Sequence, residues 1–157
     1  MAPIKFELFT SYSQVSVFTA GLDQPFNDWE PQHVEQGFAW RPGSVSFATL
    51  EEAGVLHCEA VVADAWRQHP EAERVIRVPF AVVGDSVEIA SISDGAVFAL
   101  GAVGPCQLVF ETWVDRQADM QARLTFVPHH GSVPPAILKA DSALRPPAAL
   151  RMTARSA

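Results

Sequence analysis

The chain has 157 residues, of which 48% are apolar and 18% charged, a composition that excludes disorder of the low-hydrophobicity, high-charge kind. Eighteen acidic and eleven basic side chains give a net charge of −7, and because an acidic surface repels phosphate we expect no direct binding to nucleic acid. The charge is uneven: residues 140–157 hold three arginines and one aspartate, so residues 1–139 hold eight bases and seventeen acids, a net charge of −9.

Apolar and polar residues alternate with a period of two along most of the chain, which predicts strands rather than helices. One short helix is expected at residues 30–36, with Pro31 near its first position and Gly37 as its stop. Asp94-Gly95 favours a tight type I′ hairpin, because both residues tolerate a positive φ. In chain order, the strands are expected at residues 6–10, 15–19, 45–49, 55–62, 75–83, 87–92, 96–100, 107–114 and 122–127.

About nine short strands, with turn signals at roughly 8–12-residue spacing, predict an all-β fold, an antiparallel β-sandwich with one short helix. Pro79 cannot donate a ladder hydrogen bond, so its strand is expected at a sheet edge or with a bulge at that position. Residues 1–138 are expected to form a single domain. Residues 139–157 are rich in Ala, Pro and Arg and contain Pro146-Pro147, so we expect a mobile tail.

Three features of the sequence indicate the cellular location. No apolar run is long enough to cross a membrane, and the first residues lack a signal-peptide pattern. A core of this size needs no disulfide, so Cys58 and Cys106 are expected to be buried thiols in a reducing compartment. We therefore expect a cytoplasmic protein with no direct membrane contact.

Enzyme chemistry has little support in the sequence. No Gly-x-Ser-x-Gly elbow, phosphate-binding loop or dinucleotide fingerprint is present, so no catalytic residue and no cofactor are expected. Of the five histidines only His129 and His130 are neighbours, and adjacent residues on a strand point to opposite faces. We therefore expect no metal site.

Acidic and aromatic residues in the expected loops are the candidates for binding a partner. An exposed tryptophan beside carboxylates can combine burial with charge at an interface. The alternatives are a solvated rim, a sugar platform and a calcium-binding loop end, although the acid spacing lacks the usual Asp, Asn and Gly alternation of calcium loops. The candidate residues are Asp28, Trp29, Glu51, Glu52, Glu71 and Glu73.

Seven segments between residues 6 and 127 form a characteristic pattern in their order and spacing. They are Ser11–Phe18, Asp28-Trp29, Val34–Ala39, Gly43–Phe47, Arg77–Val82, Val87–Ile92 and Phe110–Val114. In this pattern the chain resembles the competence protein J family, whose known member type is the DNA-entry nuclease inhibitor of competent bacteria. It departs from the family pattern between Asp64 and Glu73 and in the C-terminal tail.

What the resemblance implies is a small non-enzymatic protein that binds and inhibits a DNase. The partner is then a nuclease of competence or a nuclease toxin against which the chain acts as an immunity protein. The acidic body suggests a mechanism, in which carboxylates take the place of phosphates in the basic groove of the DNase. The alternatives are a calcium- or carbohydrate-binding β-sandwich module, and a structural or assembly protein.

Overall fold

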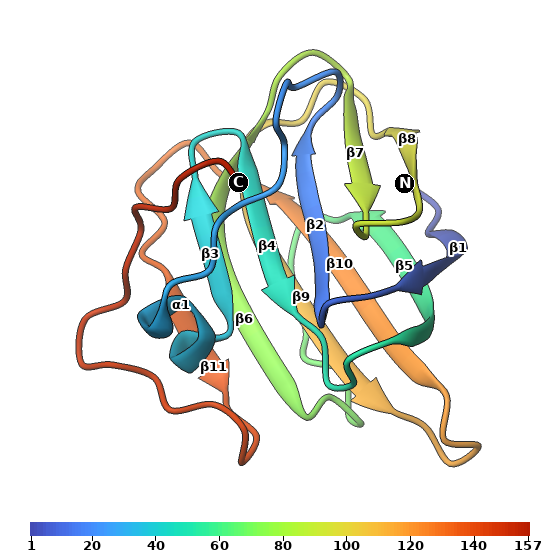
Figure 1. Ribbon diagram of the computed structural model, residues 1–157. Coiled ribbons are helices and arrows are strands. Elements are labelled where there is room, and N and C mark those ends of the chain that lie inside the picture. The colour runs from blue at the N-terminus through green and yellow to red at the C-terminus, as the bar shows by residue number, and fades with distance from the viewer.

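A computed structural model describes all residues, 1–157, as two packed β-sheets with one short helix (Figure 1). The six-stranded sheet has the order β1-β5-β10-β9-β6-β11, and the five-stranded sheet has the order β3-β4-β2-β7-β8. The strands of the first sheet are β1 (Ile4–Thr10), β5 (Gly54–Val62), β10 (Met120–Pro128), β9 (Gly104–Val114), β6 (Arg74–Val82) and β11 (Ala136–Lys139). Those of the second are β3 (Phe38–Arg41), β4 (Ser44–Ala48), β2 (Gln14–Thr19), β7 (Ser86–Ala90) and β8 (Gly95–Ala99).

The all-β prediction is confirmed, and every ladder is antiparallel except the one between β5 and β10. The predicted nine strands correspond to nine of the eleven observed. The other two, β3 and β11, have four residues each. Such short strands show too little alternation to be recognised, and β3 begins immediately after the expected helix.

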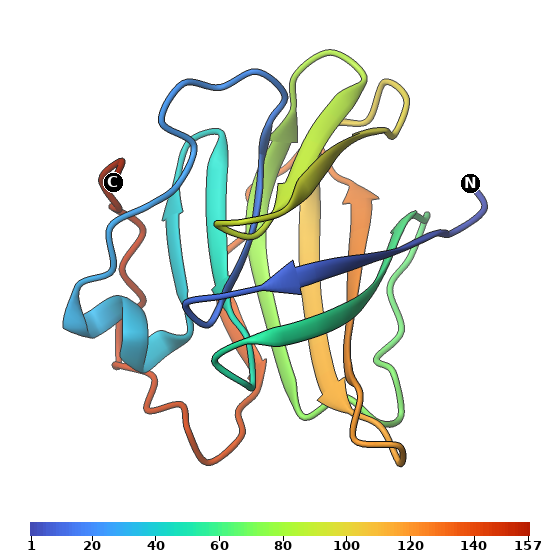
Figure 2. The same cartoon turned by 45° about the vertical axis from the view of Figure 1, so that its right-hand side comes forward.

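The core lies between the two sheets, and Figure 2 shows both sheets in a second view, turned by 45° from Figure 1. Inward side chains of both sheets form one cluster of 23 buried residues. Phe47 from β4 and Phe110 from β9 stack across the interface, with ring centroids 4.5 Å apart. The strand β2 is buried on both faces, because the following loop folds back over the sheet. Asn27 of that loop is 3% exposed and donates to the carbonyl of Ala39.

The helix α1 (Pro31–Gln36) has the predicted start and stop. Nδ1 of His33 accepts the N–H of Glu30 at 3.0 Å, and Gly37 ends the helix with a φ of 84°. Burial and the charge of Arg151 lower the pKa of His33, so the ring stays neutral and Nδ1 keeps its lone pair for this cap. The chain has no helix of the length and apolarity that a bilayer crossing needs.

The structure changes the prediction for the Asp94-Gly95 turn and agrees with the prediction for Pro79. The hairpin of β7 and β8 forms, but its loop is Ser91–Asp94, and neither Asp94 nor Gly95 adopts a positive φ. Gly95 is needed for space, since a Cβ there would lie 2.5 Å from the Cβ of Ala90. Pro79 lies in β6, which β11 accompanies only from Val75 to Arg77. Beyond that point β6 is an edge, as the proline requires.

Residues 139–157, expected to be a mobile tail, run along α1 and β3 (Figure 1). The amide of Arg145 donates to Glu35 and that of Ala154 to Trp40, both at 2.8 Å. Leu144 is 8% exposed and covers Gly37, where a Cβ would lie 2.8 Å from the leucine. The domain boundary at residue 138 stays a prediction.

Candidate functional site

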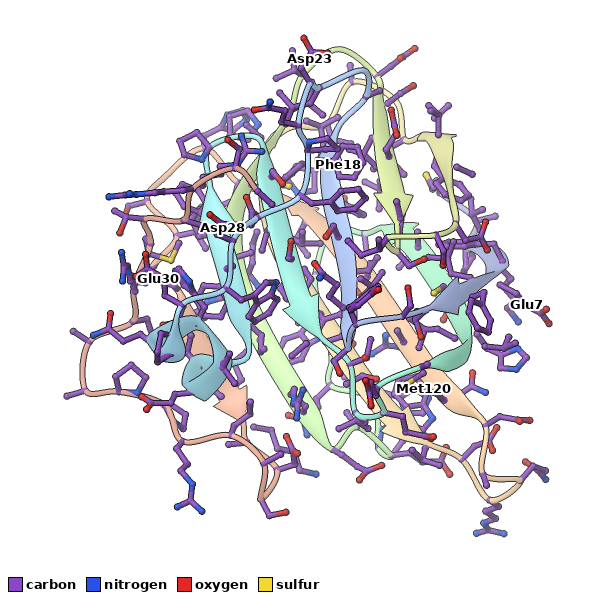
Figure 3. The ribbon with its side chains drawn as sticks, viewed as in Figure 1. Glu7, Phe18, Asp23, Asp28, Glu30 and Met120 are labelled. Atoms are coloured by element: carbon purple, nitrogen blue, oxygen red, sulfur yellow. The ribbon has the colours of Figure 1, made fainter.

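One end of the sandwich gathers four connections: the β1–β2 turn, the β4–β5 loop, the last part of the β5–β6 loop, and the β9–β10 loop. This end is the lower one in Figure 1, and Figure 3 marks it with the label of Met120. Glu51 and Asp119 line one hollow of about 300 Å³ there. Glu71 and Asp115 line a second hollow of about 350 Å³. We call this region the acidic end, and its acids are Glu51, Glu52, Glu71, Glu73, Asp115 and Asp119.

Two of these six carboxylates support the fold. Glu73 accepts the backbone N–H of Val114 at 2.8 Å. Asp115 accepts two backbone amides of its own loop and the side-chain amide of Gln121. The other four are exposed and make no side-chain hydrogen bond or ion pair within the protein, so they are free to contact a partner: Glu51, Glu52, Glu71 and Asp119.

Four of the six predicted partner-binding residues therefore come together at the acidic end, and two do not. Asp28 lies on the flank of the five-stranded sheet, where its amide donates to the carbonyl of Arg155 at 2.8 Å. Trp29 is half-buried, and its indole N–H points to Oε1 of Gln14 at 3.4 Å. Trp29 shares a hollow with Tyr12 and Ser13 of the β1–β2 turn, whereas Asp28 remains apart.

An apolar hollow of about 330 Å³ adjoins the acidic end, lined by Tyr12, Ser13, Trp29, Val34 and Ala48. Tyr12 and Ser13 form a two-residue turn, and both have a φ of 57°. Ser13 donates its amide to the carbonyl of Glu52 and accepts the amide of Thr49, both at 2.9 Å. The expected strands at residues 6–10 and 15–19 leave this turn between them, without a role. The only signal in the sequence is an aromatic residue in a short connection between two strands.

A larger cavity, of about 400 Å³, lies on the outer face of the six-stranded sheet. Its walls include Glu7 and His57, whose side chains approach to 3.3 Å, and the stacked rings of His69 and Trp113, 3.9 Å apart. Beside it lies Glu111, which is completely buried and was not singled out by the sequence. Glu111 accepts hydrogen bonds from Trp66, His69 and Arg123, and so fixes the β5–β6 loop against the sheet.

The chemistry open to the remaining reactive groups is limited. No three His, Cys, Asp or Glu side chains are grouped closely enough to hold a metal ion. Cys58 and Cys106 are free, and burial raises the pKa of each thiol to about 12. Both are therefore protonated near neutral pH and are poor nucleophiles.

The fold has relatives among solved structures. ComJ from Bacillus subtilis, described as the inhibitor of the DNA-degrading activity of NucA, superposes with a TM-score of 0.68 at 24% identity, over 80% of this chain and 96% of that one. The protein described as crocagin biosynthetic gene J has a TM-score of 0.55 at 12% identity, over 83% of this chain and 100% of that one. No curated protein matches at a significant level.

These identities are low, so the structural likeness shows the shared fold alone. The sequence itself gives the family. Residues 7–127, most of the chain, match the family model of competence protein J. The range agrees with the resemblance found from the motifs between residues 6 and 127, and it leaves the C-terminal segment outside. The chain belongs to the competence protein J (ComJ) family.

Proposed function

We propose that this chain is a protein inhibitor of a DNase and not itself an enzyme. The observation that carries the proposal is its membership of the ComJ family, together with a fold that it shares with nearly the whole of Bacillus subtilis ComJ. That protein is described as an inhibitor of the DNA-degrading activity of NucA. A nuclease protein is therefore the proposed partner, and the role requires no cofactor.

Charge supports the same role. A DNase must present a positive surface to the phosphates of its substrate. This chain has a net charge of −7, and four carboxylates at the acidic end have no partner within the protein. Carboxylates in such positions can take the place of phosphates in a basic groove, and opposite charges also speed the encounter of two proteins.

The proposed contact surface has Glu51, Glu52 and Glu71 at its centre, with Trp29 at its margin. Glu73 belongs to the same end, although its hydrogen bond to Val114 commits part of its carboxylate to the fold. Asp28 is exposed but lies apart from the acidic end, so it would contact a partner only at a separate point on the neighbouring flank.

Two settings are consistent with this role: control of a competence nuclease, and immunity against a DNase toxin. The earlier alternative, a calcium- or carbohydrate-binding module, is not favoured by the family assignment. We propose the cytoplasm as the compartment, which is supported by two buried cysteines that remain free thiols.

Inhibition is tested with the DNase activities of the source organism, separated by chromatography and assayed on duplex DNA. We expect the purified chain to suppress cleavage by at least one fraction in a dose-dependent way. A gel shift with the same DNA is the control. Salt-sensitive binding of the chain to DNA at micromolar concentration would mean that it shields the substrate and does not inhibit the enzyme.

The double variant Glu51→Lys/Glu52→Lys is expected to associate several-fold more slowly with the inhibited nuclease at low salt, because surface charges act mainly on the association rate. The difference should shrink at high salt, since the Debye length falls to about 3 Å at 1 M. Stopped-flow measurements of the association rate constant over a series of salt concentrations test this prediction.

The matched control is Asp23→Lys/Asp85→Lys, which makes the same change in net charge. Both aspartates are exposed in loops away from the acidic end, and Figure 3 marks the position of Asp23. Equal slowing by the two double variants would mean that net charge alone steers association and that the acidic end has no special part.

A further inference from the structure

We propose that Tyr12 is the anchor residue of this inhibitor, the side chain that enters an apolar recess in the basic surface of the nuclease. The inference rests on the proposed function and adds to it a residue outside the acidic pairs. Three features support Tyr12 as the anchor: the backbone conformation of the β1–β2 turn, the exposure of the Tyr12 ring, and the surroundings of that ring.

The backbone of the turn is unfavourable for the residues that occupy it. Tyr12 and Ser13 both have a φ of 57°, the left-handed region that two-residue turns usually fill with Gly, Asn or Asp. The turn is clamped in this shape by the β4–β5 loop, through the 2.9 Å hydrogen bonds that link Ser13 to Glu52 and Thr49. Residues held in sparsely populated conformations gather at binding and catalytic sites. A tyrosine in this position is therefore a feature that the fold tolerates and does not need.

The Tyr12 side chain buries little of its surface, so its packing does not offset the cost of the positive φ. It is 74% exposed, the largest value among the exposed large apolar side chains of the chain. Its hydroxyl makes no hydrogen bond within the protein. The hydrogen-bonded turn thus presents an aromatic ring to solvent from a backbone position that is already held, so no further backbone ordering is needed when a partner covers it.

The surroundings of the ring resemble the centre of a protein interface. The hollow beside it contains Trp29 and Val34, and Val34 is 60% exposed. Tyrosine and tryptophan are the residues most often found to dominate binding energy when they are surrounded by contacts that exclude water. Next to the turn lies Glu52, whose carbonyl accepts the amide of Ser13, and Glu51 precedes it in the β4–β5 loop. An apolar anchor beside free carboxylates is complementary to a basic surface that contains an apolar recess. The DNA-binding face of the proposed nuclease has the required positive charge.

The substitution Tyr12→Asn separates binding from folding. Asparagine adopts a positive φ more readily than tyrosine, so the melting temperature should stay the same or rise. Against the DNase fraction that the wild-type chain inhibits, we expect the inhibition constant to increase at least tenfold, mainly through faster dissociation. Gln24→Asn is the matched control, because Gln24 is another exposed residue with a positive φ, 47°, and does not line the hollow. It should leave inhibition unchanged.

A second measurement uses the fact that Tyr12 is the only tyrosine of the chain. Nitration by tetranitromethane should modify Tyr12 rapidly in the free protein, while the two cysteines are buried and protonated. In the complex with the nuclease, we expect nitration of Tyr12 to be strongly slowed. Mass spectrometry of the inhibitor chain measures both rates.

The outcomes separate this inference from the function on which it rests. If the wild-type chain inhibits no DNase fraction, the proposed function fails and the anchor with it. If it does inhibit, but Tyr12→Asn inhibits equally and Tyr12 is nitrated equally fast in the complex, the anchor is overturned and the inhibitor function stands. Weaker inhibition by Tyr12→Asn at an unchanged melting temperature, with protection from nitration, supports the anchor.

Discussion

Glu111→Ala is expected to lower the free energy of unfolding by about 3–5 kcal/mol, because it removes a fully buried carboxylate and leaves three hydrogen-bond donors, one of them a guanidinium, without their acceptor. Glu111 is 0% exposed, and its carboxylate accepts from the Arg123 guanidinium at 2.7 Å, the His69 amide at 2.6 Å and the Trp66 indole at 3.0 Å. For a chain of this size such a loss lowers the melting temperature on the order of 10 °C. Urea unfolding followed by circular dichroism measures it.

The loss should also be visible locally. With its acceptor removed, the β5–β6 loop has fewer contacts to the sheet, and Trp66 should become more exposed, with a red shift of tryptophan fluorescence. Glu59→Ala is the matched control: Glu59 lies in register with Arg123 but makes no side-chain hydrogen bond. Its removal should change stability by less than about 0.5 kcal/mol. Equal effects of the two substitutions would contradict the assigned role of Glu111.

Much of the fold was predictable because alternation is a local property. Each strand of more than four residues could be recognised from its own side chains, and α1 from Pro31 and Gly37. Pairing is different. The parallel contact of β5 with β10 pairs residues more than sixty positions apart, and nothing in either segment specifies its neighbour. The Asp94-Gly95 hairpin shows a further limit: the dipeptide predicted the hairpin, but Ser91, through its hydrogen bonds to Asp94, set the loop.

The candidate site was predictable only in its parts. Glu51-Glu52 and Glu71 were recognisable as acids in loops, yet their common location depends on how the two sheets stack. In the sequence, Glu111 is a single carboxylate in an apolar strand. Its three hydrogen-bond donors come from another loop and another strand, so the sequence does not show that they meet. Tyr12 was missed because its importance lies in a backbone angle and an exposed ring, neither of which the sequence displays.

Asp141→Ala is expected to cost about 3–5 kcal/mol, because it would leave a buried guanidinium without its partner. The Arg74 side chain is 3% exposed and holds Asp141 through two hydrogen bonds, of 2.7 and 2.9 Å. A third, to the carbonyl of Ala48, prevents the arginine from turning out to solvent. Asp64→Ala, the removal of an exposed aspartate with no side-chain hydrogen bond, is the control and should be nearly neutral.

Acidic pH should abolish the difference in the free energy of unfolding between the wild type and Asp141→Ala. Burial alone would raise the pKa of Asp141, but the hydrogen bonds and charge of Arg74 outweigh it and hold the pKa below its ordinary value of 3.8. A carboxylate with a lowered folded pKa stabilises the protein above its unfolded pKa and loses that contribution as the pH falls through the folded value. The stability difference between wild type and Asp141→Ala should therefore be constant near neutral pH and decline below pH 3.8.

The same substitution decides whether residues 139–157 are docked or mobile. If the segment is mobile in solution, as its composition predicts, Asp141 spends little time at Arg74 and its loss changes stability by less than about 0.5 kcal/mol. If the segment is docked, the full loss appears, and Arg74→Met/Asp141→Leu should recover most of it, because apolar replacement of both partners of a buried pair is often neutral. Hydrogen exchange at the amides of Arg151 and Ala154, which donate to Gln36 and Trp40, gives an independent reading. Slow exchange there, together with a large effect of Asp141→Ala, would move the domain boundary to the end of the chain.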